Sequence, residues 1–93
     1  MLKTNTYFEG KVVSIAFQTA TLPATVGVME IGEYEFDTSK KETVTVVSGC
    51  LTVKLPGCET WQDYPAGKSF VVDANKVFQL KIGEETAYLC TYE

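Results

Sequence analysis

Apolar and polar residues alternate along most of this chain. Alternation with a period of two residues is typical of β-strands that bury one face, and no segment has a convincing helical period. The pattern therefore predicts an all-β protein. The expected strands are Lys11 to Phe17, Thr25 to Ile31, Glu33 to Asp37, Thr43 to Ser48, Cys50 to Leu55, Trp61 to Tyr64, Ser69 to Val72, Val77 to Ile82 and Thr86 to Tyr92.

Turn-forming residues interrupt this alternation about every eight to twelve residues, the spacing expected of β-sandwiches and barrels. Ser48-Gly49 separates two expected strands by the length of a tight hairpin, in which Gly49 can adopt a positive φ. Consecutive hairpins predict an antiparallel sheet. Such a sheet protects its edges by closing into a barrel, by folding into a double-sheet jelly roll or by pairing across a dimer.

Composition narrows the class of protein. The 93 residues suffice for one domain, residues 1–93, and 45% of them are hydrophobic, so a core is expected without disulfides. The net charge of −4 and the absence of arginine disfavour binding to nucleic acid. The three cysteines lack the spacing of a disulfide framework or a zinc site. No segment resembles a signal peptide or a membrane span, so a cytoplasmic location is expected.

Two short motifs resemble those of the cupin barrels. Glu42 and Gly49 keep the E-x6-G spacing of the first cupin motif, and the segment from Tyr64 to Phe70 resembles the start of the second, P-x-G-x-x-H. Phe70 occupies the histidine position of the second motif, while the histidine pair of the first would fall near Phe36 and Thr38. The chain contains no histidine. A single cupin-like, jelly-roll antiparallel β-barrel without the usual metal cage is therefore expected.

A larger set of segments resembles one family from about Tyr7 to Tyr92. The segments are Thr25-Val26-Gly27-Val28-Met29, Gly32-Glu33-Tyr34-x-Phe36-x-Thr38, Glu42-x-x-Thr45-Val46-x-Ser48-Gly49, Trp61-x-x-Tyr64-x-Ala66-Gly67-x-x-Phe70-x-Val72 and Tyr88-Leu89-Cys90-x-Tyr92. Their order and spacing resemble the pyrimidine/purine nucleoside phosphorylase family. The resemblance implies a homodimeric, metal-free cupin and a pentosyltransferase of nucleoside salvage. It would split purine and pyrimidine nucleosides with phosphate, its co-substrate, into free base and ribose 1-phosphate, with no cofactor.

Glu42 is the candidate catalytic residue. Cleavage of an N-glycosidic bond builds positive charge on the ribose, and a carboxylate at the cupin glutamate position would stabilise that charge. A solvated glutamate at a strand end is the alternative, because charged side chains are mostly exposed.

Candidate phosphate-binding residues flank Glu42 on both sides. Lys40 and Lys41 precede it, and Thr45 and Ser48 follow it with hydroxyl groups; lysines and hydroxyls together with backbone N–H groups bind phosphate in proteins. The alternative is a pair of solvated lysines beside ordinary strand residues.

Candidate residues for binding the nucleoside are Tyr34, Phe36, Thr38, Phe70 and Gln79. An aromatic ring stacks on any base, a threonine hydroxyl donates a hydrogen bond, and an amide offers one donor and one acceptor to a base edge. The alternatives are that the rings pack in the core and that Gln79 is an exposed strand residue without a role in binding.

Two other functions remain open. One is a non-catalytic cupin that binds a small ligand or serves as a dimeric interaction module, because a fold does not fix a function. The other is a metal-dependent cupin with carboxylate ligands only, disfavoured by the missing histidines. The dimer is expected to cover sheet edges and aromatic residues around Trp61, Tyr64 and Tyr7-Phe8.

Overall fold

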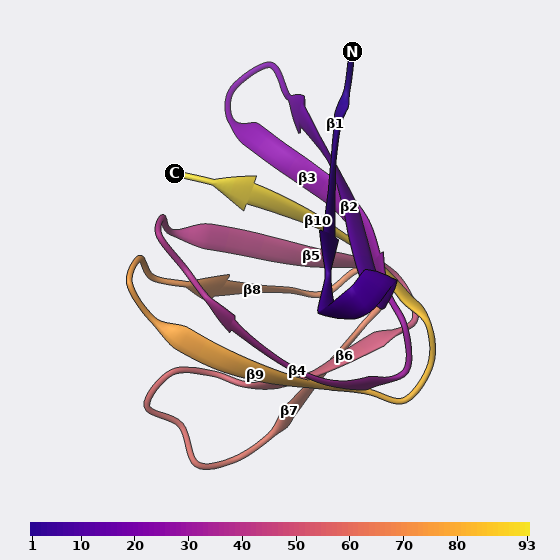
Figure 1. Cartoon of the computed structure of the whole chain (residues 1–93). Helices are drawn as coiled ribbons and strands as arrows, with labels where there is room; N and C mark the ends of the chain where they lie inside the picture. Colours follow the sequence, from indigo (N-terminus) through magenta and orange to yellow (C-terminus); the bar gives the residue numbers. More distant parts are fainter.

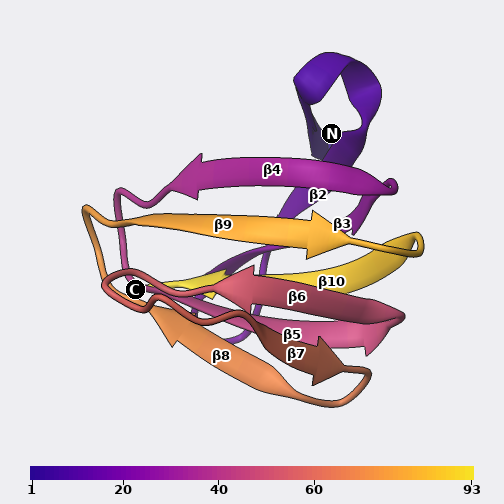
Figure 2. The ribbon, with the colours of Figure 1, turned by 90° about the horizontal axis from the view of Figure 1, so that it is seen from below.

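A computed structural model describes residues 1–93 as two antiparallel β-sheets that face each other (Figure 1). The six-stranded sheet has the order β1 (Lys3–Tyr7), β2 (Val12–Gln18), β3 (Pro23–Met29), β10 (Thr86–Tyr92), β5 (Glu42–Ser48) and β8 (Ser69–Val72). The four-stranded sheet has the order β4 (Gly32–Asp37), β9 (Val77–Ile82), β6 (Cys50–Lys54) and β7 (Gln62–Pro65), and it lies in front in Figure 2. A short 3-10 turn, η1 (Phe8–Gly10), joins β1 to β2.

The alternating pattern located every strand except the first. The nine expected strands are β2 to β10, with ends displaced by no more than two residues. The pattern does not predict β1, because its sequence, Lys-Thr-Asn-Thr-Tyr, is polar on both faces and four of its five residues are exposed. This strand forms through backbone pairing with β2, from Lys3 opposite Ala16 to Tyr7 opposite Val12.

Most consecutive strands lie in different sheets. Among successive strands only β1 and β2, β2 and β3, and β6 and β7 pair with each other. The expected hairpin across Ser48-Gly49 was therefore wrong, although Gly49 has the positive φ predicted for it, 92°. Gly49 instead turns the chain from β5 in one sheet to β6 in the other. A Cβ at this position would lie 2.5 Å from Thr86 Oγ1, so only glycine fits. This alternation between sheets is the arrangement of a jelly roll.

The core fills the space between the sheets. One cluster of 14 buried residues contains the inward side chains of both sheets, among them Val12, Val46 and Val72 on one side and Leu51 and Leu80 on the other. Each fully buried aliphatic side chain of this kind contributes roughly 1.5–3 kcal/mol to stability. The alternation predicted from the sequence is thus the division between core and surface.

The outer faces of the two sheets differ in character. The outer face of the four-stranded sheet carries polar side chains, including Glu33, Glu35, Thr52, Lys54, Gln79 and Lys81. The outer face of the six-stranded sheet carries exposed Val13, Ile15, Phe17, Val26 and Val28, here called the outer apolar face. No helix in the structure is long and apolar enough to cross a membrane.

Candidate functional site

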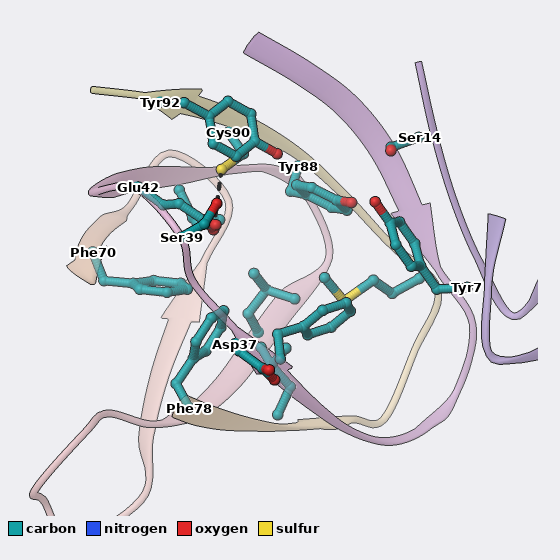
Figure 3. A pocket seen from close by; sticks show the side chains of 15 residues that line it. Tyr7, Ser14, Asp37, Ser39, Glu42, Phe70, Phe78, Tyr88, Cys90 and Tyr92 are labelled. Atoms are coloured by element: carbon teal, nitrogen blue, oxygen red, sulfur yellow. Dashed lines mark hydrogen bonds between the residues drawn. The ribbon is translucent and has the colours of Figure 1, made fainter. Parts of the chain in front are cut away.

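A cavity of about 270 Å³ lies between the two sheets and is lined by 15 residues, 11 of them hydrophobic (Figure 3). Its volume is close to the lower end of the roughly 300–1,000 Å³ typical of small-ligand pockets. Its polar side chains form two groups. One contains the carboxylate of Glu42 with the hydroxyl of Ser39, and the other contains the hydroxyls of Tyr7, Ser14 and Tyr88, while the carboxylate of Asp37 lies apart from both (Figure 3).

Glu42 is the first residue of β5, and strand alternation turns it inward with Val44 and Val46. It lies opposite Tyr92 of β10 in the sheet register, and its carboxylate is half-buried in the cavity wall. Burial raises the pKa of Glu42, and a hydrogen bond from a neighbouring thiol opposes this rise. The structure therefore brings this predicted residue into the cavity with an environment unlike that of a solvated glutamate.

Cys90 supplies that hydrogen bond. Its Sγ lies 3.5 Å from Oε1 of Glu42, drawn as a dashed line in Figure 3. The thiol is buried, and burial followed by the nearby Glu42 carboxylate raises its pKa to about 12. Because the thiol stays protonated at neutral pH, it acts as a hydrogen-bond donor to the carboxylate, which is nearer than its other acceptor, the backbone oxygen of Thr91 at 3.9 Å.

The inward face of β10 carries Tyr88, Cys90 and Tyr92, and all three line the cavity. The hydroxyl of Tyr92 lies 2.9 Å from Oγ1 of Thr25 on the neighbouring strand. Burial raises the pKa of Tyr92, so its hydroxyl remains neutral. β10 lies between β3 and β5 in the six-stranded sheet, which fixes this row of side chains on both sides.

Aromatic rings form one wall of the cavity. The rings of Phe36 and Phe78 are stacked with centroids 6.0 Å apart and an interplanar angle of 28°. Phe70 meets Phe78 edge to face at 6.2 Å. Phe36 and Phe70 thus both line the cavity, as a role in base binding requires, and Phe70 is at the same time 5% exposed and part of the core cluster.

Tyr34 and Gln79 lie outside this cavity. The Tyr34 hydroxyl donates to the backbone oxygen of Glu30 at 2.8 Å. Gln79 is on the outer face of the four-stranded sheet, where its amide donates to Glu35 Oε1 at 3.3 Å. Both residues border a separate shallow hollow beside Trp61.

Thr38 is buried and ties two loops together. Its hydroxyl donates to the backbone oxygen of Asp73 at 2.6 Å and accepts a hydrogen bond from the backbone N–H of Lys76 at 3.0 Å. Both sides of the hydroxyl are thus occupied within the chain, and Thr38 does not line the cavity.

The four candidate phosphate-binding residues are not gathered in one place. Lys40 and Lys41 are exposed in the loop between β4 and β5, at the end of the cavity where Glu42 lies. Thr45 is on the opposite face of β5 from Glu42, with its hydroxyl 2.8 Å from that of Ser69. Ser48 is exposed at the far end of the same strand. Only the two lysines are near the cavity, and no lysine lines it.

The sequence predicts no role in the site for seven polar residues that line the cavity: Tyr7, Ser14, Asp37, Ser39, Tyr88, Cys90 and Tyr92. The alternation of positions 88, 90 and 92 placed three of them on one face of a predicted strand. That this face meets Glu42 depends on the pairing of β10 with β5, across more than forty residues of sequence. No group of three His, Cys, Asp or Glu side chains converges in the structure in a way that would hold a metal ion.

The model of the pyrimidine/purine nucleoside phosphorylase family matches residues 2–92. The chain is 67% identical to pyrimidine/purine nucleoside phosphorylase 2 of Psychrobacter arcticus, covering 99% of this chain and 98% of that one. It is 64% identical to the pyrimidine/purine nucleoside phosphorylase of Hahella chejuensis, covering 99% of both chains.

Solved structures give the same result for the fold. A protein of unknown function from Vibrio parahaemolyticus is 44% identical, with a TM-score of 0.96, over 100% of this chain and 99% of that one. An RmlC-like cupin from Shewanella frigidimarina, at 18% identity and a TM-score of 0.77 over 98% of this chain and 82% of that one, confirms the predicted cupin-like fold. This chain belongs to the pyrimidine/purine nucleoside phosphorylase family.

Proposed function

We propose that this chain is a nucleoside phosphorylase, a pentosyltransferase of broad specificity that works in the cavity between its two sheets. It splits purine and pyrimidine nucleosides with inorganic phosphate into free base and ribose 1-phosphate. Family membership and the names of its relatives support the reaction. The observation that carries the site is the Glu42 carboxylate, half-buried in a cavity that is also lined by Phe36, Phe70 and Phe78.

In this proposal the Glu42 carboxylate acts on the ribose, and the aromatic rings of the cavity bind the base. Breaking the bond between the base and C1′ leaves positive charge on the ribose, and the carboxylate of Glu42 stabilises it in a partly dry site. The rings of Phe36, Phe70 and Phe78 offer a surface on which purines and pyrimidines stack alike. Lys40 and Lys41 lie on the Glu42 side, where phosphate approaches C1′ from the face opposite the base.

The test is release of free base from inosine and from uridine. Purified protein is expected to release hypoxanthine and uracil when phosphate is present and neither when phosphate is omitted. Formation of ribose 1-phosphate in equal amount identifies phosphorolysis rather than hydrolysis. Absence of base release from every nucleoside tried would favour the non-catalytic alternative, a small-ligand binding module.

We further propose that the reaction needs no metal ion or other cofactor. The chain has no histidine, and its carboxylates and thiols do not converge in threes. Turnover is therefore expected to persist after dialysis against EDTA. Loss of activity in EDTA that one added divalent metal restores would contradict this.

The outer apolar face favours a homodimer. Isolated subunits rarely expose a contiguous apolar patch of this kind, whereas the polar outer face of the opposite sheet is suited to water. A second copy covers this face best, because a symmetric dimer pairs the same surface with itself. Tyr7 and Phe8, which the sequence suggests for this role, are exposed to the same degree as Ile15 and Val26. Tyr7 and Phe8 pack on Phe36, and Trp61 lies under the Lys81 amine, whose Nζ is 4.3 Å from the ring centroid.

A further inference from the structure

The hydroxyls of Tyr7, Ser14 and Tyr88 form a second polar group in the cavity, separate from the carboxylates. Figure 3 shows them together on one side, while Glu42 and Cys90 lie on another. Tyr88 and Tyr92 are four residues apart on β10, which places their positions about 13 Å apart along the strand. Glu42 pairs with Tyr92 and Val46 with Tyr88, so the backbone positions of Glu42 and Tyr88 are also several residues apart along the sheet. The carboxylate of Glu42 and the three hydroxyls thus lie toward different sides of the cavity (Figure 3), as binding of the ribose and the base of one nucleoside requires.

Gly27 makes room for this group. It lies between Ser14 of β2 and Tyr88 of β10 in the sheet register. A Cβ at Gly27 would lie 2.7 Å from the Tyr88 hydroxyl oxygen, and a side chain there would displace it. The absent side chain lets the Tyr88 hydroxyl lie over the strand toward Ser14. Glycine at this position thus leaves room both for the Tyr88 hydroxyl and for the backbone oxygen of Val13, which would also lie 2.7 Å from an added Cβ.

The Tyr7 hydroxyl is brought to the group by a strained turn. Phe8, Glu9 and Gly10 of η1 all have positive φ, at 51°, 59° and 90°. Such a conformation is unfavourable for residues other than glycine and persists where surrounding contacts impose it. Phe8 provides them, with its ring 5.0 Å from Tyr34 and 5.4 Å from Phe36. The anchored turn holds the Tyr7 ring edge to face against Phe36 at 6.0 Å.

The chemistry of the group suits a nucleobase better than phosphate. Hydroxyls both donate and accept, so three of them can satisfy the mixed carbonyl and N–H edges of purines and pyrimidines. A phosphate dianion requires concentrated donors, usually with a cation, and no lysine lines this cavity. The aromatic wall of Phe36 and Phe78 runs beside the hydroxyls, so a base could stack and present its edge to them. Burial, with Cys90 and Tyr7 adding to it and the Ser14 hydroxyl opposing it, raises the pKa of Tyr88 to about 12, so it remains a donor at neutral pH.

We infer that Tyr7, Ser14 and Tyr88 form the base subsite, which recognises the base edge and stabilises the base as it departs. The inference rests on the proposed function for its reaction. The bond between C1′ and the base nitrogen breaks with its electron pair staying on the base, and a phosphate oxygen forms the new bond to C1′. Hydroxyl donors stabilise the negative charge on the base. The proton that the attacking hydrogen phosphate gives up returns, through water, to the base.

The first experiment measures binding without turnover. Calorimetry gives the affinities of wild type, Tyr88→Phe, Ser14→Ala and Tyr7→Phe for hypoxanthine, uracil and ribose 1-phosphate. Loss of one neutral hydrogen bond is expected to weaken binding of both bases about 3- to 10-fold and to leave binding of ribose 1-phosphate unchanged. Tyr64→Phe is the matched control, because its hydroxyl bonds to Gln62 outside the cavity. Tyr7→Phe alters an exposed residue, so it stays informative even if an inner variant fails to fold.

The second experiment separates binding from departure of the base. Tyr88→Phe is expected to lower kcat/KM for inosine at least 10-fold more than for 4-nitrophenyl riboside, whose phenolate leaves without a donor. Weaker binding of ribose 1-phosphate or inorganic phosphate, with base binding intact, would overturn the inference and make the group a phosphate subsite. Unchanged affinities in all three variants would also overturn it. A wild type that binds bases but never releases them from nucleosides would instead contradict the proposed function.

Discussion

At the scale of single residues, the environment of Glu42 differs most from that of a surface glutamate. Its carboxylate faces an aromatic cavity, and the donor beside it is a weak, neutral thiol. Burial therefore raises its pKa, and no lysine in the cavity wall counteracts this. In its ionised form this carboxylate has no cationic partner in the cavity wall and is therefore available to stabilise a cationic ribose.

We predict that Glu42→Gln lowers kcat by roughly 10² to 10³ for both inosine and uridine, because the ribose is common to both substrates. The variant keeps the shape and removes the charge. Because the folded-state pKa is raised, the charged form costs stability above the unfolded pKa, and this cost disappears as the pH falls through the folded pKa. Glu42→Gln should therefore melt no lower than wild type at neutral pH. A wild-type kcat in this variant would show that the charge of Glu42 has no role in catalysis. A lowered melting temperature would show that Glu42 contributes to stability instead.

Cys90 is predicted to act through Glu42. Its hydrogen bond lowers the pKa of Glu42, so Cys90→Ala should raise that pKa and move the acidic limb of the kcat profile to higher pH. The shift should be less than about one pH unit, because a thiol is a weak donor. Cys90→Ser retains a donor and is the control, expected to leave the limb at or below its wild-type position. Identical profiles for the alanine and serine variants would show that the hydrogen bond has no influence on Glu42.

At the scale of elements, strands were predictable from the sequence and their partners were not. Glu42 and Thr45 are three residues apart, so alternation places them on opposite faces of β5. The sequence alone therefore predicts that Thr45 does not share a site with Glu42. Ser48 has the right parity but lies six residues away, about 20 Å along a strand. The neighbours of Glu42, by contrast, follow from the pairing of β5 with β10, which no local pattern specifies. Local periodicity thus predicts on which face of its strand each side chain lies, whereas the long-range pairing of strands determines which side chains meet in the cavity.

The sheet-to-sheet turn at Gly49 gives a test of this architecture. Gly49→Ala is expected to destabilise the fold by about 1–2 kcal/mol for its positive φ alone, and by more because the new Cβ overlaps Thr86. Each kcal/mol lowers the melting temperature by roughly 4–8 °C in a domain of this size. Gly67→Ala is the matched control, with a φ of 88° but no atom within 4 Å of the added Cβ. Equal melting temperatures for the two variants would mean that the contact with Thr86 is unimportant.

At the scale of the whole molecule, the two outer surfaces predict how copies associate. Val26→Lys places a charge between Ile15 and Leu89 in the middle of the outer apolar face and should convert a dimer into a monomer. Thr52→Lys places the same side chain on the polar outer face of the other sheet and should leave the dimer intact. Light scattering at micromolar concentration gives the mass of each. A monomeric wild type would contradict the proposed dimer.

The position of β10 also bears on how the protein reaches its structure during synthesis. It is the last strand in the chain, yet it lies between β3 and β5 in the larger sheet. β4 likewise pairs with β9, which follows some forty residues later in the sequence, so this pair cannot form until β9 has been synthesised. Folds built on such distant pairings form slowly, in milliseconds to seconds, because loop closure precedes any gain from contacts. The cavity wall made by Tyr88, Cys90 and Tyr92 therefore cannot form during synthesis until translation has passed Tyr92. Until then β3 and β5 each have an unpaired edge, which is open to aggregation or to binding by chaperones.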